Sequence, residues 1–301
     1  MKRIFPHRKS AGFPKKSITM IVPTGAGVED TEARGIAPYA QKYLRVKVLV
    51  ENQVGAWGRI AFEKFQRMEP DGYHLIAYTF PRSIIVEHMC MTSFRTKDFT
   101  PVFAWSLGNP LLVVPTATYE TFHEFLNSAR VRTLSGALPV RAGISHLFGI
   151  LLANELGINV DWVPYEGSAL CMAALARKDI DFTICLPTAL PSWIKKGKIR
   201  PLIILSDKRD AYFPEIPTTK ELGYDISFIS TRRGVQAPPH TPPDIVMVLE
   251  EAFSKAVKDP AYMEWAKRNH VFIDPLRAQE FSRVVAEAYL EIEKFKEMLK
   301  A

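Results

Sequence analysis

Cysteine is scarce in this chain of 301 residues, which contains three, Cys90, Cys171 and Cys185. An odd number at such wide spacing fits neither a disulfide framework nor a set of zinc ligands. Cys171 and Cys185 could pair with each other, and the alternative is that both are small, buried hydrophobic residues. The cysteines therefore leave the redox compartment open.

Other signatures of common protein classes are missing as well. No apolar run approaches the roughly 20 residues that a membrane-spanning helix requires. The seven histidines form no HxxxH or HxH pair, so we expect no metal site. The glycine-containing turn at residues 24–27 has neither the Gly-Lys-Ser/Thr of a Walker loop nor the full GxGxxG spacing. We therefore expect no cofactor.

Acidic residues are absent from the first 28 positions, and this absence explains most of the net charge of +7. Six basic residues lie in this stretch: Lys2, Arg3, Arg8, Lys9, Lys15 and Lys16. The rest of the chain is nearly neutral, so we expect no binding of nucleic acid. Residues 1–16 begin with basic residues, as a signal peptide does, but no apolar stretch follows them. We interpret them as a flexible basic tail, and whether a signal peptide was removed stays open.

Short β-rich runs alternate with helical patterns along the chain, which is typical of βαβ units and a mostly parallel sheet. Strands are expected at residues 17–23, 46–51, 73–79, 111–115, 160–164, 180–186, 199–205 and 234–237. Helices are expected behind Glu29 and Asp30, near residues 60–65, 121–130, 146–156, 168–177 and 189–196, and twice near the C-terminus. The alternation resumes after a crossover, and this predicts two domains.

Ser145 and His146 are the one pair of neighbours that suggests catalysis. Adjacent residues on a helix point in different directions, so they do not form a nucleophile and its base. We interpret Ser145 as a helix cap and His146 as a packing residue. Nothing in the sequence identifies an enzyme.

A strand, a short turn with small residues and a helix start recur four times, at residues 24–30, 79–83, 143–146 and 167–168. Each helix start offers unpaired N–H groups and the positive end of the helix dipole, which together favour an anion such as a carboxylate. In open parallel sheets, the carboxyl ends of the strands line the ligand crevice. The four turns are either ordinary connections or the walls of an anion-binding cleft.

Several motifs occur in the order and at the spacing of one known family. They are SITMIVPTGAG at residues 17–27, VENQVGAWGRIAFEKFQRMEPDGYHLIAY at 50–78, KDFTPV at 97–102, SHL at 145–147, VPYEGS at 163–168, LP at 190–191, KGKIR at 196–200, EIPT at 215–218 and AP at 237–238. With these motifs, residues 17–301 resemble the extracytoplasmic solute receptors of tripartite tricarboxylate transporters, the Bug family.

The resemblance implies an α/β protein with the two-lobed periplasmic-binding-protein fold of type II, the Venus flytrap. Each lobe would be a mostly parallel sheet flanked by helices. Lobe 1 would comprise residues 17–116 and 234–301, and lobe 2 residues 117–233. The crossovers would then lie at LLVVPT and GVQAPP.

The implied function is that of a periplasmic, monomeric solute-binding protein without enzymatic activity. It would capture a small organic acid, a dicarboxylate or an aromatic carboxylate, and deliver it to the membrane permease subunits of a tripartite transporter. A ligand-sensing module without a transport role, or an enzyme on the same scaffold, are the alternatives.

The resemblance also implies the ligand-binding residues. In the family, the first βα loop, the loop after the PDGY strand and the loop before the Ser-His helix enclose the ligand carboxylates. Carried over by position, the expected residues are Thr24, Gly25, Ala26, Gly27, Val28, Thr79, Phe80, Arg82, Ser83, Gly143, Ser145, His146, Leu186 and Arg232.

The sequence departs from the family where arginines appear. Arg82 stands where members usually carry small hydroxyl residues, and Arg232 with Arg233 stands where an aromatic residue is common. Arginine binds carboxylates through two parallel hydrogen bonds, so a larger, more strongly anionic or aromatic acid would explain these changes. Arg82 and Arg232 are therefore expected to select the ligand, and the alternative is that each arginine is a solvated charge at the rim.

Overall fold

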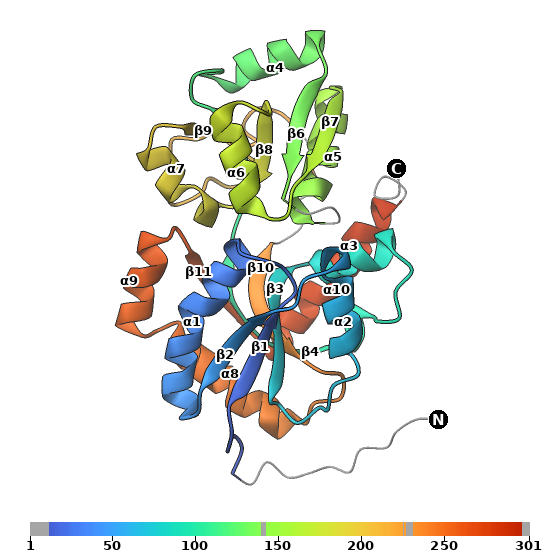
Figure 1. Cartoon of the computed structure of the whole chain (residues 1–301), viewed down its shortest axis with the longest axis vertical. Coiled ribbons are helices and arrows are strands. Elements are labelled where there is room, and N and C mark those ends of the chain that lie inside the picture. Colours follow the sequence, from blue (N-terminus) through green and yellow to red (C-terminus); the bar gives the residue numbers. More distant parts are fainter. Residues whose placement is uncertain (1–11, 140–142, 225, 227–230, 297–301) are drawn as a thin grey trace.

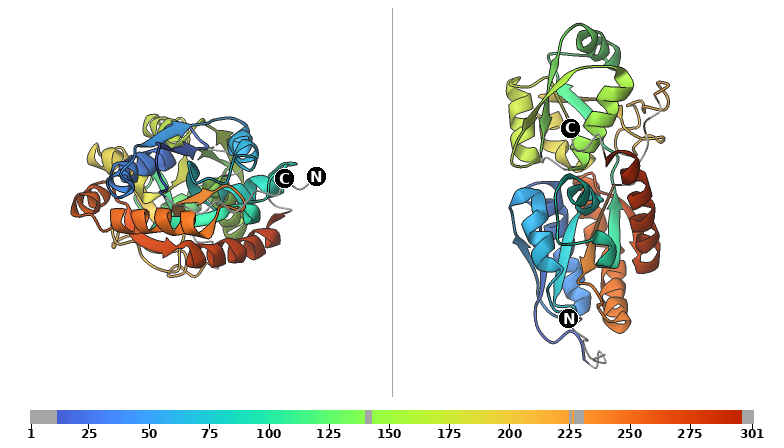
Figure 2. Two further views of the ribbon diagram at one scale, coloured as in Figure 1. Left: turned by 90° about the horizontal axis from the view of Figure 1, so that it is seen from below. Right: turned by 90° about the vertical axis from the view of Figure 1, so that its right-hand side faces the viewer.

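The structure is a computed structural model that describes residues 12–139, 143–224, 226 and 231–296. This part of the chain forms two α/β lobes, each built on one mixed sheet with helices against it (Figure 1). The lobes lie end to end along the long axis of the molecule, as the side view also shows (Figure 2). The two-lobed α/β fold predicted from the sequence is confirmed.

The first lobe contains a six-stranded sheet in the order β11-β4-β10-β3-β1-β2. Its strands are β1 (Ile18–Val22), β2 (Val48–Asn52), β3 (His74–Phe80), β4 (Thr100–Leu107), β10 (Arg232–Ala237) and β11 (Phe272–Arg277). β1 is parallel to β2 and β3, whereas β10 is antiparallel to β3 and β4, and β11 is antiparallel to β4. The sheet is therefore parallel on one side and antiparallel on the other.

Helices cover both faces of this sheet because the apolar residues of its strands alternate between the two faces. In β3, Leu75 and Ala77 join one buried cluster, while Ile76 and Tyr78 join another. The cluster of Leu75 includes residues of α1 (Val28–Leu44), α8 (Pro243–Ala256) and α9 (Pro260–Arg268). The cluster of Ile76 includes residues of α2 (Arg59–Phe65), α3 (Arg82–Met89) and α10 (Ala278–Lys294). The two helix layers are separated by the sheet (Figure 1).

The second lobe contains a five-stranded sheet in the order β7-β6-β8-β5-β9. Its strands are β5 (Leu111–Pro115), β6 (Leu134–Leu138), β7 (Val160–Pro164), β8 (Phe182–Cys185) and β9 (Ile199–Ile204). β6 is parallel to β7 and β8, and β5 is antiparallel to β8 and β9. Its helices are α4 (Phe122–Val131), α5 (Ile144–Leu156), α6 (Ser168–Arg177) and α7 (Pro191–Lys195), with a short 3-10 turn, η3 (Pro187–Ala189), after β8.

The chain crosses between the sheets after β4 and returns before β10. We expected residues 111–115 in lobe 1, but β5 pairs with β8 and β9 of the second sheet. That expectation was wrong because a buried apolar strand carries no mark of the sheet it joins. The two crossings touch each other, since the Gly108 amide donates to the Thr231 carbonyl at 3.0 Å and the Thr231 hydroxyl donates to the Gly108 carbonyl.

Three strands were not predicted from the sequence: β4, β6 and β11. β11 has the half-exposed sequence FIDPLR and β6 the small-residue sequence LSGAL, so neither shows a strong apolar pattern. Three helices rather than two follow β10 in the described residues. α3 begins directly after Pro81, at the turn and helix start predicted for residues 79–83.

The predicted basic tail is only partly within the described residues. Residues 1–11 lie outside them. Residues 13–16 are not a flexible tail, because Phe13 packs edge-on against Tyr73 at 5.1 Å and the Lys15 amide donates to the Tyr73 hydroxyl at 2.9 Å. Lys16 also lies over the Tyr73 ring.

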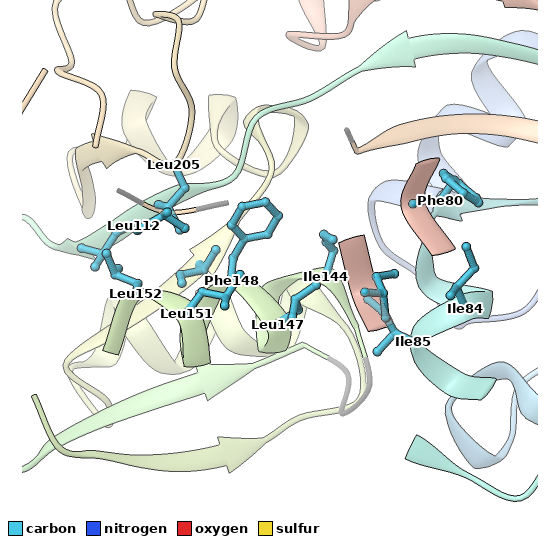
Figure 3. Packing of buried hydrophobic residues seen from close by; sticks show 14 of the residues in the cluster. Phe80, Ile84, Ile85, Leu112, Ile144, Leu147, Phe148, Leu151, Leu152 and Leu205 are labelled. Atoms are coloured by element: carbon cyan, nitrogen blue, oxygen red, sulfur yellow. The ribbon is translucent and has the colours of Figure 1, made fainter. Parts of the chain in front are cut away.

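One buried apolar cluster continues from lobe to lobe. Phe80, Ile84 and Ile85 come from the first lobe, and Ile144 and Phe148 from α5 of the second (Figure 3). This contact holds the starts of α3 and α5 near each other. Within the described residues, no helix combines the length and apolarity needed to cross a membrane.

We predict that Phe62→Ala lowers the free energy of unfolding by about 3–5 kcal/mol, because deleting a buried ring leaves a cavity. Phe62 is fully buried, and its ring lies 5.1 Å from that of Tyr78 and 5.2 Å from that of Phe94. Ile60→Ala is the control on the same helix, where Ile60 is 53% exposed, and should change stability by less than about 0.5 kcal/mol. Urea unfolding followed by circular dichroism measures both. Equal losses would contradict the packing described.

Candidate functional site

Four helix starts face one cavity between the lobes. The caps of α1, α3, α5 and α6 are Gly27, Pro81, Gly143 and Gly167. In the structure as described, no side chain of these four residues accepts a hydrogen bond from the first turn of its helix. Each start therefore keeps amide donors and a partial positive charge of about half an elementary charge. Two of these helices belong to the first lobe and two to the second, so an anion here would contact both lobes.

The cavity is small, about 60 Å³. Its lining comprises Thr24, Gly25, Ala26, Gly27, Val28, Glu29, Thr79, Arg82, Pro139, Gly143, Ile144, Ser145, Gly167, Ser168, Cys185 and Leu186. Hollows of about 980 and 510 Å³ also exist, but no start of these four helices lines either of them. A choice of site by volume alone would therefore have selected a hollow that these four helix starts do not line.

The small cavity collects most of the residues expected to bind ligand. Those that line it are Thr24, Gly25, Ala26, Gly27, Val28, Thr79, Arg82, Gly143, Ser145 and Leu186. The four turns read from the sequence as anion-binding candidates thus meet at one place. The loop at residues 24–30 of the first lobe and the turn at residues 167–168 of the second lobe lie close together. A Cβ on Gly167 would be 3.0 Å from the Ala26 carbonyl oxygen.

Three expected residues point elsewhere. Phe80 lies in the apolar cluster with its ring 5.5 Å from Phe281, and the Ser83 hydroxyl bonds to that of Tyr78 at 2.8 Å. His146 packs edge-on against the Trp162 ring at 6.3 Å. The interpretation of His146 as a packing residue fits this position. Ser145 is not the cap, because α5 begins two residues earlier than expected, at Ile144, and its cap is Gly143.

Arg232 also lies outside the cavity that collects the other residues. Its Nη2 is 2.7 Å from Asp274 Oδ2, and its Nη1 donates to the Asp274 carbonyl at 2.8 Å. Asp274 is on β11, which was not predicted from the sequence. We therefore do not include Arg232 in the candidate site.

Several residues of the cavity were not expected from the sequence to bind ligand. Gly167 and Ser168 were recognised as an anion-binding turn, but the resemblance did not carry them over as ligand residues. Cys185 lines the cavity as a free thiol, and burial raises its pKa. Cys171 is free as well, so the alternative of a Cys171–Cys185 disulfide is not realised.

Glu29 is the most consequential of the missed residues. Its Oε1 accepts hydrogen bonds from the Thr79 amide and from Arg82 Nε, both at 2.9 Å, and lies 2.9 Å from Arg82 Nη2. Its Oε2 accepts a hydrogen bond from the Thr24 hydroxyl at 2.8 Å. Glu29 and Arg82 are 5% and 8% exposed, so they form a buried ion pair. In the sequence, Glu29 was recognised only as an acid in the first turn of a helix.

Arg82 keeps one donor that the pair does not use. Its Nη1 is buried, and among the described residues it has no hydrogen-bond partner. A buried donor of this kind is costly unless an acceptor meets it. Arg82 lines the cavity, so a bound anion is a suitable acceptor.

A second buried ion pair lies in the first lobe, one turn further along α1, and a hydrogen bond connects it to the second lobe. Glu32 Oε1 lies 2.9 Å from Arg233 Nε and accepts a hydrogen bond from the Thr188 hydroxyl at 3.1 Å. Glu32 Oε2 accepts from the Ser106 hydroxyl at 2.6 Å. Arg233 is 1% exposed, so it is not a solvated charge at the rim. Because Thr188 belongs to the second lobe, this pair links the two lobes beside the cavity.

Comparison with known proteins places the chain in one family. The model of the tripartite tricarboxylate transporter family receptor matches residues 32–301. A UPF0065 protein of Cupriavidus necator is 30% identical over 282 residues, which cover 91% of this chain and 85% of that protein.

Two solved structures are similar over nearly the whole chain. The periplasmic binding protein BugD is 25% identical, with a TM-score of 0.85 over 95% of this chain and 98% of that one. Rpa4515 of R. palustris, solved with adipate, is 25% identical, with a TM-score of 0.86 over the same shares of 95% and 98%.

We predict that Arg82→Ala lowers the free energy of unfolding of the ligand-free protein by about 3–5 kcal/mol, because it leaves the Glu29 carboxylate buried without its cation. Arg34→Ala is the control, since Arg34 pairs with Asp30 on the same first turns of α1 but is 51% exposed. That change should cost about 0.5 kcal/mol or less. Chemical unfolding of both variants measures the difference. A loss at Arg82 no larger than at Arg34 would rule out the buried pair.

Proposed function

Because the chain belongs to the tripartite tricarboxylate transporter receptor family, we propose that it captures a small organic carboxylate between its lobes. In this proposal the protein acts in the periplasm as a monomer and delivers the acid to the membrane permease subunits of a tripartite transporter. The two chain segments that connect its lobes would be those next to Gly108 and Thr231. β5 would then belong to the second lobe. The adipate in the structure of Rpa4515 supports a carboxylate ligand.

The observation that carries the proposal is the convergence of four helix starts from both lobes on one cavity. An anion bound there interacts favourably with each lobe only when the lobes are together. Its binding energy therefore favours the closed arrangement over an open one. This is the behaviour that a hinged receptor requires.

An enzyme on this scaffold has less support. Ser145 lines the cavity, but the neighbouring His146 packs against Trp162. Among the described residues of the lining there is no histidine, and the Glu29 carboxylate is held by Arg82. The cavity thus offers donors for an anion rather than a nucleophile with its base.

We predict that an organic acid at 100 times its Kd raises the unfolding free energy by about 2.7 kcal/mol, which a thermal-shift screen starting with adipate detects. Gly27→Val should abolish this shift. The backbone at Gly27 is extended, with φ at 169°, so the fold tolerates a side chain there. A Cβ on Gly27 would lie 3.2 Å from Ser168 Oγ of the second lobe, so a larger side chain fills the cavity.

Ile60→Ala is the control, because Ile60 is 53% exposed and does not line the cavity. This variant should bind like the unchanged protein. Undiminished binding by a folded Gly27→Val variant would remove the first loop from the site.

We also predict that the acid with the largest thermal shift lowers the radius of gyration in small-angle X-ray scattering. The crossings next to Gly108 and Thr231 would act as hinges, and ligand would draw the lobes together. The Gly27→Val variant serves as the control and should show no change with the acid. An unchanged radius at saturation would count against a hinged receptor.

A further inference from the structure

We propose that Glu29 supplies one carboxylate of the site from the protein itself, so that the ligand is a monocarboxylate rather than a dicarboxylate. The inference rests on the proposed function and narrows its ligand class. It assigns to Glu29 the role of a specificity-determining residue.

The bonding of Glu29 is that of a bound carboxylate ligand. A backbone amide, a guanidinium and a hydroxyl donate to its two oxygens, from Thr79, Arg82 and Thr24. Amides at loops and arginine side chains are the donors that receptors use for anionic ligands. Thr24, Thr79 and Arg82 all line the cavity, and so does Glu29. The side chain therefore occupies donors that a ligand carboxylate would otherwise take.

The remaining charge suits one further carboxylate. The full charges of Glu29 and Arg82 cancel, and Arg82 is the single Lys or Arg among the described residues of the lining. What is left is the partial positive charge of the helix starts and the unused Nη1 of Arg82. One carboxylate balances these groups. A second would lie beside the buried Glu29 carboxylate, where like charges repel strongly.

The size of the cavity agrees with the charge. Its volume of about 60 Å³ is small, but it exceeds the roughly 10–15 Å³ of cavity that one water molecule requires. One carboxylate group fits in this space, with the hydroxyls of Ser145 and Ser168 on the side of the second lobe. A ligand carboxylate could displace Glu29 only by breaking its bonds to Thr79, Arg82 and Thr24.

The test compares acids that differ in one carboxylate. Calorimetry at pH 7 and constant ionic strength would measure three pairs: succinamate and succinate, adipic acid monoamide and adipate, and benzoate and terephthalate. In every pair that binds, the monocarboxylate should bind at least tenfold more tightly. In E29Q, which keeps the size of the side chain and removes its charge, the affinity for the dicarboxylate should rise at least tenfold.

Asp30→Asn is the matched control. It removes the neighbouring acid of the same helix turn, which bonds to Arg34 and Asn52 and does not line the cavity. The preference for monocarboxylates should be the same in this variant as in the unchanged protein. The comparison in the unchanged protein does not depend on how well any variant folds.

The outcomes separate this inference from the proposed function. If a dicarboxylate binds the unchanged protein as tightly as its partner, or if folded E29Q keeps the original preference, Glu29 does not select the ligand, while carboxylate binding stands. If the folded protein and E29Q bind no member of any pair and the wider acid screen also fails, the proposed function falls and the inference with it.

Discussion

The positive ends of four helices converge on one cavity, and this concentration of charge must be balanced by an anion. Glycine or proline at each cap supplies no side-chain acceptor for the first-turn amides of the helices. Glu29 provides part of the balance, and Arg82 holds it in place. In the proposed function, the ligand supplies the rest of the balance.

Helix α1 fixes this arrangement through two buried acids. Glu29 and Glu32 are three residues apart, so they lie on the same side of the helix. Glu29 bonds to residues at the end of β3 and the start of α3, and Glu32 bonds to Arg233 on β10 and to Thr188 in the second lobe. Buried ion pairs add little net stability compared with apolar packing, but breaking one is costly. Each pair therefore restricts where α1 can lie.

The sequence predicted the features that depend on local pattern. The β1 and β3 strands and the four helix starts were recognised from short β-rich runs and turn residues. What it could not predict depends on distant pairing. Arg232 was assigned to the ligand from its place in the family pattern, and its partner Asp274 lies on β11, which shows no strong apolar pattern. Likewise, the direction of the Glu29 side chain depends on Arg82, which is 53 positions away in sequence.

The contact between Glu32 and Thr188 joins the lobes without using any atom of a ligand. In the proposed hinged receptor, it would contribute to the equilibrium between open and closed protein before any acid arrives. Apparent affinity is the intrinsic affinity scaled by the fraction of molecules that can accept the ligand. Two competing acids face the same fraction, which cancels when their affinities are compared. The strength of binding and the choice of acid can thus change independently during evolution, one through residues that link the lobes and the other through residues that line the cavity.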